Sequence, residues 1–259
     1  MRIYVINPNT TASMTDTIAK AAKHVAAKDT EIIAMTSTAG AVSIECHYDE
    51  AMSIMGLAQA IKDANDIEEK RGNRAGIATG RDHAFVIACF GDPGLLAVRE
   101  LTAAPVLGIA EAAMHAASFL ATGFSVVTTL GRTRVIAEHL VRNYGMEHHC
   151  RRVRAIDLPV LELENPASDA RGRILAECQR ALAEDNSAAI VLGCAGMADL
   201  VAYLSDKLGV PVIDGVTAAV KFAEALVGLG LGTSKKGDLA FPLYKPYKGT
   251  ISNFAPGQK

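Results

Sequence analysis

The chain has 259 residues, 50% of them hydrophobic and 21% charged, which is enough to bury a sizeable core and to form two small domains. The 26 Lys and Arg residues against 28 Asp and Glu residues leave a net charge of −2, and the absence of a long basic run excludes an extended nucleic-acid-binding surface. The N-terminus lacks the pattern of a secretory signal, and no apolar run approaches the roughly 20 residues of a membrane span. We therefore expect a cytoplasmic protein that binds a small molecule and neither nucleic acid nor membrane.

Short apolar strands alternate with amphipathic helices from the start of the chain. A buried strand is predicted at Arg2–Ile6, followed by the polar loop Asn7–Thr11 and by a helix over Ser13–Ala27. A second strand at Glu31–Met35 leads through a polar stretch into a helix from Ala51 to about Ala64. The first third of the chain is therefore built from β-loop-α units.

A charged segment over residues 65–81 is predicted to be a solvated loop or an extension of the preceding helix. After it, the apolar run Phe85–Ala88 ends on Cys89, and the residues Gly-Asp-Pro-Gly at 91–94 supply a turn, an N-cap and a proline suited to open a helix. That helix is predicted to run through Leu101. The sequence thus places a thiol at a strand-to-helix junction.

The second half of the chain repeats this organisation. A strand with a polar end is predicted at Phe124–Thr129, a helix from about Arg132 to Asn143, a strand at Arg152–Ile156 and a helix at Ala170–Ala183. A further β-branched run, residues 189–192, precedes a second cysteine, Cys194, and small residues that lead into a helical pattern. Two cysteines therefore occupy equivalent positions.

An internal repeat connects the two halves. Cys89 and Cys194 are 105 residues apart, and the Pro-Val strands that begin at Pro105 and Pro211 are 106 apart. This spacing predicts an α/β fold of two pseudo-symmetric domains, each a mainly parallel sheet flanked by helices. We expect the first domain to comprise residues 1–110 with 216–259, the second to comprise residues 111–215, and the active site to lie in the cleft between them.

The carboxyl ends of parallel strands form the ligand-binding edge of such a sheet. Cys89 and Cys194 both follow strands, so two thiols are expected to flank whatever binds in the cleft. A free thiol has a pKa of about 8.5, which a helix N-terminus or backbone N–H groups can lower. A thiolate on one side and a thiol on the other can invert the stereocentre of a carbon acid without a cofactor. In agreement with this, the sequence contains no glycine motif of the kind that binds cofactor phosphates.

Each of these residues also has an ordinary structural explanation. A lone cysteine at a strand end is more often a core residue, and this explanation holds for Cys46, Cys150 and Cys178. Residues 7–10 can be a helix cap, and Thr128 with Thr129 a strand end. His47 lies between acidic residues but has no second cluster, so an exposed polar loop is favoured over a metal site. Five cysteines without close pairing favour neither a disulfide framework nor structural zinc.

Several motifs spread over the chain resemble the aspartate/glutamate racemase superfamily, and more narrowly its hydantoin and allantoin racemase branch. They are NPNT at 7–10, SIE at 43–45 with DE at 49–50, VIACFGDPGL at 86–95, SVVTTL at 125–130, AIDLPVL at 155–161, VLGCAGM at 191–197 and PVIDGV at 211–216. The resemblance implies two pseudo-symmetric α/β domains, cofactor-independent two-base catalysis, no metal and a homo-oligomer. Residues 90–100, 108–115 and 233–242 are more similar to allantoin racemases, with hydantoin racemases acting on 5-substituted hydantoins as the alternative.

Carried over motif by motif, the resemblance implies that Cys89 and Cys194 are the acid and base of the reaction. It further implies that the ring carbonyl, N–H and ureido groups of the substrate bind to Asn9, Ser43, Phe90, Gly91, Thr128, Gly193 and Ala195. Backbone N–H groups near Gly91 and Ala195 are expected to stabilise an enolate oxygen. A decarboxylase or cis-trans isomerase is disfavoured because both cysteines are kept, and a non-catalytic binding module on the same fold remains the rival from another functional class.

Overall fold

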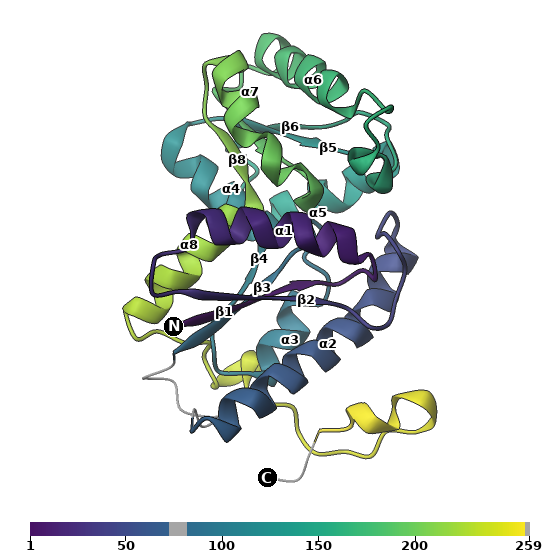
Figure 1. The fold of residues 1–259 in the computed structure, drawn as a ribbon, viewed down its shortest axis with the longest axis vertical. Helices are drawn as coiled ribbons and strands as arrows, with labels where there is room; N and C mark the ends of the chain where they lie inside the picture. Colours follow the sequence, from purple (N-terminus) through teal and green to yellow (C-terminus); the bar gives the residue numbers. More distant parts are fainter. Residues whose placement is uncertain (73–81, 257–259) are drawn as a thin grey trace.

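Two parallel sheets, one in each half of the chain, form the framework of the computed structural model, which describes residues 1–72 and 82–256 (Figure 1). The strands of the first sheet pair in the order β2-β1-β3-β4, and those of the second in the order β6-β5-β7-β8. Every paired strand is parallel to its neighbour. The first-sheet strands are β1 (Arg2–Asn7), β2 (Glu31–Thr36), β3 (His83–Ile87) and β4 (Val106–Gly108), and the second-sheet strands are β5 (Phe124–Thr128), β6 (Cys150–Ala155), β7 (Ala189–Leu192) and β8 (Val212–Asp214).

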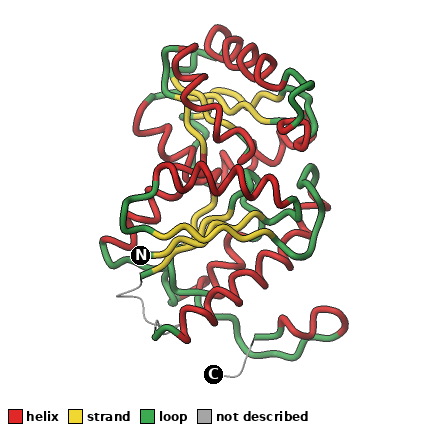
Figure 2. The backbone as a smooth tube through the Cα atoms, in the orientation of Figure 1, coloured by secondary structure: helices red, strands yellow, loops and turns green. Residues whose placement is uncertain are grey.

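The equivalent strand order in the two sheets confirms the prediction of a duplicated α/β fold. Helices follow strands throughout, and Figure 2 shows the two groups of strands with helical layers above, between and below them. The helices are α1 (Ala12–Val25), α2 (His47–Lys70), α3 (Leu95–Leu101), α4 (Ile109–Leu120), α5 (Arg134–Asn143), α6 (Ala170–Glu184), α7 (Val201–Leu208) and α8 (Gly215–Gly228). Short 3-10 turns comprise η1 (Gly131–Thr133), η2 (Val160–Glu164), η3 (Ala195–Leu200), η4 (Gly237–Leu239) and η5 (Gly249–Phe254).

The central strands carry runs of buried apolar residues because helices cover both faces of each sheet. In β1, Ile3 and Val5 belong to one apolar cluster with residues of α1 and α8. Tyr4 and Ile6 point to the other face and pack with residues of α2 and α3. The period-2 alternation of a strand thus supplies two cores from one continuous apolar run.

Two helices are exchanged between the halves. Helix α4 follows β4 of the first sheet but packs in an apolar cluster with β5 and β7 of the second. Helix α8 follows β8 of the second sheet and packs against β1 and β3 of the first. The two helices begin side by side, and a Cβ atom on Gly215 would lie 2.1 Å from the carbonyl oxygen of Ile109. Glycine is therefore required at this crossing, and we propose that the domains divide here, as residues 1–110 with 216–259 and residues 111–215.

Two local expectations differ from the structure. Helix α2 runs from His47 to Lys70 and so exceeds the expected bounds of 51 to about 64 at both ends. Residues 65–70 therefore form the helix extension that was one of the two expectations for the charged segment, and residues 73–81 lie outside the described residues. The expected N-cap in the turn after Cys89 is also corrected. Gly94, with φ of +63°, is the N-cap of α3, whereas the carboxylate of Asp92 accepts hydrogen bonds from the first turn of α4.

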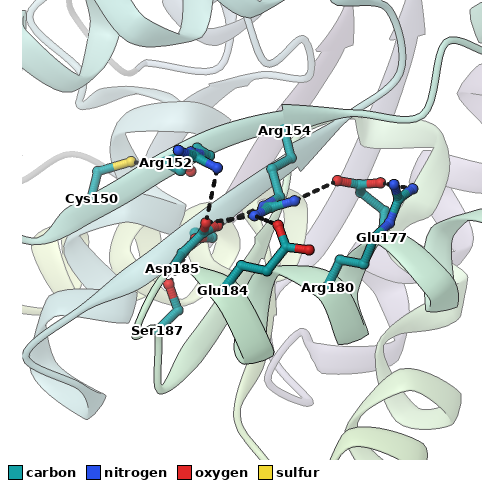
Figure 3. A network of polar contacts seen from close by, with 9 residues as sticks. Cys150, Arg152, Arg154, Glu177, Arg180, Glu184, Asp185 and Ser187 are labelled. Carbon is teal, nitrogen blue, oxygen red and sulfur yellow. Dashed lines mark hydrogen bonds and ion pairs between the residues drawn. The ribbon is translucent and has the colours of Figure 1, made fainter.

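A buried ionic cluster joins the edge strand β6 to α6 (Figure 3). The guanidinium of Arg154 lies 2.6 Å from Asp185, 2.7 Å from Glu184 and 3.1 Å from Glu177. Arg180 binds the second oxygen of Glu177. These contacts account for a charged strand at the edge of an otherwise apolar sheet. Among the described residues, no helix combines the length and apolar character that a membrane crossing requires.

Candidate active site

Cys89 and Cys194 lie two residues beyond the carboxyl ends of β3 and β7, which occupy equivalent positions in their sheets. Both thiols line one cavity of about 60 Å³. This volume has room for a few water molecules. The remaining lining residues come from both halves of the chain: Asn9, Met14, Ile44, Glu50, Ala88, Phe90, Gly91, Thr128, Thr129, Thr133, Ile136, Ala137, Val160, Gly193 and Ala195.

The two cysteines begin turns of the same form. The backbone N–H of Gly91 donates to the sulfur of Cys89, and that of Gly196 donates to the sulfur of Cys194. The next residue closes each turn, because its N–H donates to the carbonyl oxygen of the cysteine at 3.0 Å and 3.1 Å, respectively. Each thiol is therefore held by the backbone of its own turn.

Burial sets the protonation state of both thiols. It raises the pKa of Cys89 to about 12 and that of Cys194 to about 11, and the backbone N–H groups only partly oppose this. Negative charge on Glu50 also raises the pKa of Cys89, and Glu45 acts in the same sense on Cys194. The direction is opposite to the lowered pKa expected from the sequence, because desolvation outweighs the N–H donors. At these pKa values both sulfurs are protonated at neutral pH.

The residues predicted to bind substrate lie around this cavity, with one exception. Asn9, Phe90, Gly91, Thr128, Gly193 and Ala195 line it. Ser43 is half-buried in the loop between β2 and α2, and its neighbour Ile44 reaches the lining instead.

Several of these groups are already engaged. The side chain of Asn9 accepts from the N–H of Thr11 at 2.9 Å, and Thr128 donates to the carbonyl oxygen of Gly193 at 2.9 Å. The side chain of Phe90 belongs to an apolar cluster with residues of α4. The Gly91 N–H, which we expected to donate to an enolate oxygen, donates to the Cys89 sulfur instead.

Glu50 is a cavity residue that the sequence did not single out as part of the site. It lies in the first turn of α2, with its side chain 21% exposed, and burial raises the pKa of its carboxyl. A Cβ atom on Gly91 would lie 3.1 Å from Glu50 Oε1, so the carboxylate is close to the Cys89 turn. A glutamate in a first helical turn is also a common N-terminal feature, which is why its position in the sequence does not distinguish it.

Two hydrogen bonds join the halves of the chain near the cavity. The backbone N–H of Val160 in η2 donates to Glu45 Oε1 at 2.8 Å, and Ser13 donates to Glu164 at 2.8 Å. Val160 and Ile44, the residue that precedes Glu45, both line the cavity. We call the Glu45–Val160 contact the clasp, since it joins the β2–α2 loop to the second half.

The described residues contain no cluster of three or more His, Cys, Asp or Glu side chains that could hold a metal ion. His47 instead lies 3.6 Å from Glu50 at the start of α2, with its side chain exposed. The arrangement at the cavity therefore offers two thiols, a carboxylate and backbone groups. This set suits proton transfer to and from a bound carbon acid.

Known proteins match the chain over almost its whole length. Residues 3–223 match the family model described as Asp/Glu/hydantoin racemase. Hydantoin racemases from Pseudomonas sp. (strain NS671) and Rhizobium meliloti are 46% and 49% identical, with 100% and 96% of this chain and 98% of each relative covered. The structure of allantoin racemase from Klebsiella pneumoniae is 52% identical with a TM-score of 0.90, covering 99% of this chain and 100% of that one.

Proposed function

Because this chain belongs to the Asp/Glu/hydantoin racemase family and is an isomerase, we propose that it interconverts the enantiomers of allantoin through a two-cysteine proton transfer. The observation that carries the proposal is that Cys89 and Cys194 come from the two sheets and line one cavity. The 52% identity to a structure of an allantoin racemase supports the choice of substrate.

The stereocentre of allantoin is a ring carbon that bears hydrogen beside a carbonyl group. In the reactive form of the enzyme one cysteine is a thiolate and the other a thiol. The thiolate removes the ring proton, the carbon–hydrogen electron pair moves into the enolate, and the opposite thiol then protonates the carbon on its other face. The net result is inversion, with the thiolate and thiol exchanged between Cys89 and Cys194. No group other than the two sulfurs has to change its protonation state.

Ionisation of one thiol is the demanding step because burial disfavours both thiolates. The N–H groups of Gly91 and Gly196 each donate to a sulfur, so whichever cysteine is ionised has one backbone donor. A charge-assisted hydrogen bond of this kind is roughly twice as strong as a neutral one. The two matched turns therefore let either cysteine serve as the base.

Glu50 offers a reason for the choice of allantoin over a 5-alkyl hydantoin. Allantoin carries a ureido group on the stereocentre, and this group presents several N–H donors. A carboxylate that lines the cavity near Gly91 can accept them, whereas an alkyl substituent offers this carboxylate no donor. We therefore expect Glu50→Gln to raise the KM for allantoin more than that for a 5-alkyl hydantoin.

Proton NMR of single-enantiomer allantoin in D2O, with polarimetry in parallel, tests the proposal. The expected result is loss of optical rotation with uptake of deuterium at the ring carbon, well above a sample without enzyme, because the acidic ring proton also exchanges unaided. Cys89→Ser and Cys194→Ser should each lose most of the racemisation rate, while Cys178→Ser, a buried cysteine in α6 away from the cavity, is the matched control. Racemisation at the wild-type rate in either active-site variant would contradict the two-thiol mechanism, whereas deuterium uptake by one enantiomer without inversion is what the remaining thiol would produce.

The second candidate is racemisation of 5-substituted hydantoins. The 46% and 49% identity to hydantoin racemases favours it, and the chemistry at the stereocentre is the same. The same assay with 5-alkyl hydantoins separates the two, since the physiological class should show the higher kcat/KM. Binding of either compound without uptake of deuterium would instead favour a non-catalytic module.

A further inference from the structure

Asp92 joins the Cys89 turn to the second half of the chain. Its carboxylate accepts hydrogen bonds from the backbone N–H groups of Ala110 (3.1 Å) and Glu111 (2.9 Å) at the start of α4. The hydroxyl of Tyr144, the residue that follows α5, donates to the same carboxylate at 2.7 Å. Asp92 itself is only 5% exposed. Three donors, two at the start of α4 and one just after α5, thus converge on one buried side chain.

The backbone around Asp92 is shaped for this contact. Its φ is +44°, in the left-handed region that few residues other than glycine adopt. A Cβ atom on Gly108, the N-cap of α4, would lie 2.2 Å from the carboxylate carbon of Asp92. The missing side chain at Gly108 therefore makes room for a carboxylate that arrives from the cysteine turn.

The corresponding helix of the second half is capped in a different way. Helix α8, the counterpart of α4, is capped by its own preceding residue, because Asp214 accepts from the N–H of Thr217 at 2.9 Å. Met197 occupies the place in the Cys194 turn that Asp92 occupies in the Cys89 turn, and it contributes only its apolar side chain. The anchoring by a carboxylate is therefore specific to the Cys89 side.

A short chain of contacts connects the Asp92 carboxylate to the reactive sulfur. The N–H of Asp92 donates to the carbonyl oxygen of Cys89 at 3.0 Å, and Gly91, which precedes Asp92, donates its N–H to the Cys89 sulfur. Burial raises the pKa of Asp92 to about 7, while its three donors act to lower it. Displacing the carboxylate would move the peptide that holds the sulfur.

We propose that Asp92 is a positioning residue for Cys89, which holds that thiol, and not Cys194, at its place in the cavity by tying the Cys89 turn to α4 and Tyr144. The role rests on the proposed two-cysteine racemisation. Asp92→Asn keeps the size of the side chain but leaves one acceptor oxygen to face three donors. A misplacement on the ångström scale can cost about 100-fold in rate, so kcat is expected to fall by about 10- to 100-fold.

The distinguishing measurement is the primary isotope effect on kcat/KM with each α-deuterated enantiomer. Slowing the Cys89 step raises the isotope effect for the enantiomer whose proton Cys89 removes, since that step becomes more rate-limiting. It lowers the effect for the other enantiomer, because delivery of the proton by Cys89 then limits the rate. Cys89→Ser and Cys194→Ser, each measured at its residual rate, serve as references. They show in which direction the ratio of the two isotope effects changes when one or the other cysteine is impaired.

Asp92→Asn should shift the ratio of the two isotope effects in the sense of Cys89→Ser. Tyr144→Phe, which removes one donor and keeps the carboxylate, should shift it less and in the same sense, so the test survives if Asp92→Asn fails to fold. Asp214→Asn, the matched control at the start of α8, should leave the ratio unchanged. An unchanged ratio in both test variants, or a shift in the sense of Cys194→Ser, would overturn the assignment. A wild-type chain without ring-proton exchange would instead overturn the proposed function itself.

Discussion

Replacing Arg154 by methionine should destabilise the protein strongly. Among the described residues, Arg154 is the only buried cation that contacts Asp185. Asp185 and Glu177 have side chains that are 2% and 7% exposed, and both contact the Arg154 guanidinium. Removing one partner of a buried ion pair typically costs about 3–5 kcal/mol, since the other charge stays buried. At about 2–4 °C for each kcal/mol in a protein of this size, the melting temperature should fall by about 6–20 °C.

Arg180→Met is the matched control. Arg180 also binds Glu177, but its side chain is 62% exposed, so its loss should cost no more than about 1 kcal/mol. Melting curves of the two variants at pH 7, followed by circular dichroism, compare them directly. Equal losses in the two variants would refute the reasoning that burial of the partner carboxylates determines the cost.

The pH dependence provides an independent check. Arg154 lowers the pKa of Asp185, so this carboxylate contributes stability above the pKa it has in the unfolded chain, and the contribution is lost as the pH falls through the folded-state value. Arg154→Met removes the largest cause of this lowering. The wild-type melting temperature should therefore decline more steeply below about pH 4 than that of Arg154→Met.

Three further predictions concern the cavity and its surroundings. Iodoacetamide should alkylate Cys89 and Cys194 slowly at pH 7, with rates that rise about tenfold per pH unit up to at least pH 9, because burial raises both pKa values; a plateau near pH 8, read by mass spectrometry, would contradict this. Glu45→Ala breaks the clasp to Val160, so it should raise the KM by at least the factor by which it lowers kcat. Steady-state kinetics measures both, and a fall in kcat with an unchanged KM would contradict this. Gly108→Ala should lower the melting temperature and activity together, as its methyl group would lie 2.2 Å from a buried carboxylate; wild-type values for both would be incompatible with this packing.

Much of the fold follows from local patterns in the sequence. The apolar runs that precede Cys89 and Cys194 are short, β-branched and bounded by small residues, and strands of this kind lie in the middle of parallel sheets. The repeat interval between the cysteines then predicts that the two halves share one topology. Because parallel strands end at one edge, the meeting of the two thiols in a single cavity is also foreseeable.

Other features depend on contacts between distant residues and leave no local signal. An apolar helix face such as that of α4 does not indicate which of two sheets it covers, so the exchange with α8 is visible only in the structure. A carboxylate in the turn that precedes a helix is ordinarily interpreted as its cap, but Asp92 caps the next helix instead. The raised pKa values of the thiols have the same origin, since burial is a property of the assembled cavity.

The helix exchange also governs how the two halves can move. The chain passes from one half to the other at two places, at the start of α4 and at the start of α8, and these crossings touch each other. Because the two crossings are neighbours, rotation of one half against the other about the line through them strains the connecting backbone least. A rotation that moves the β2–α2 loop away from the second half would break the clasp between Glu45 and Val160.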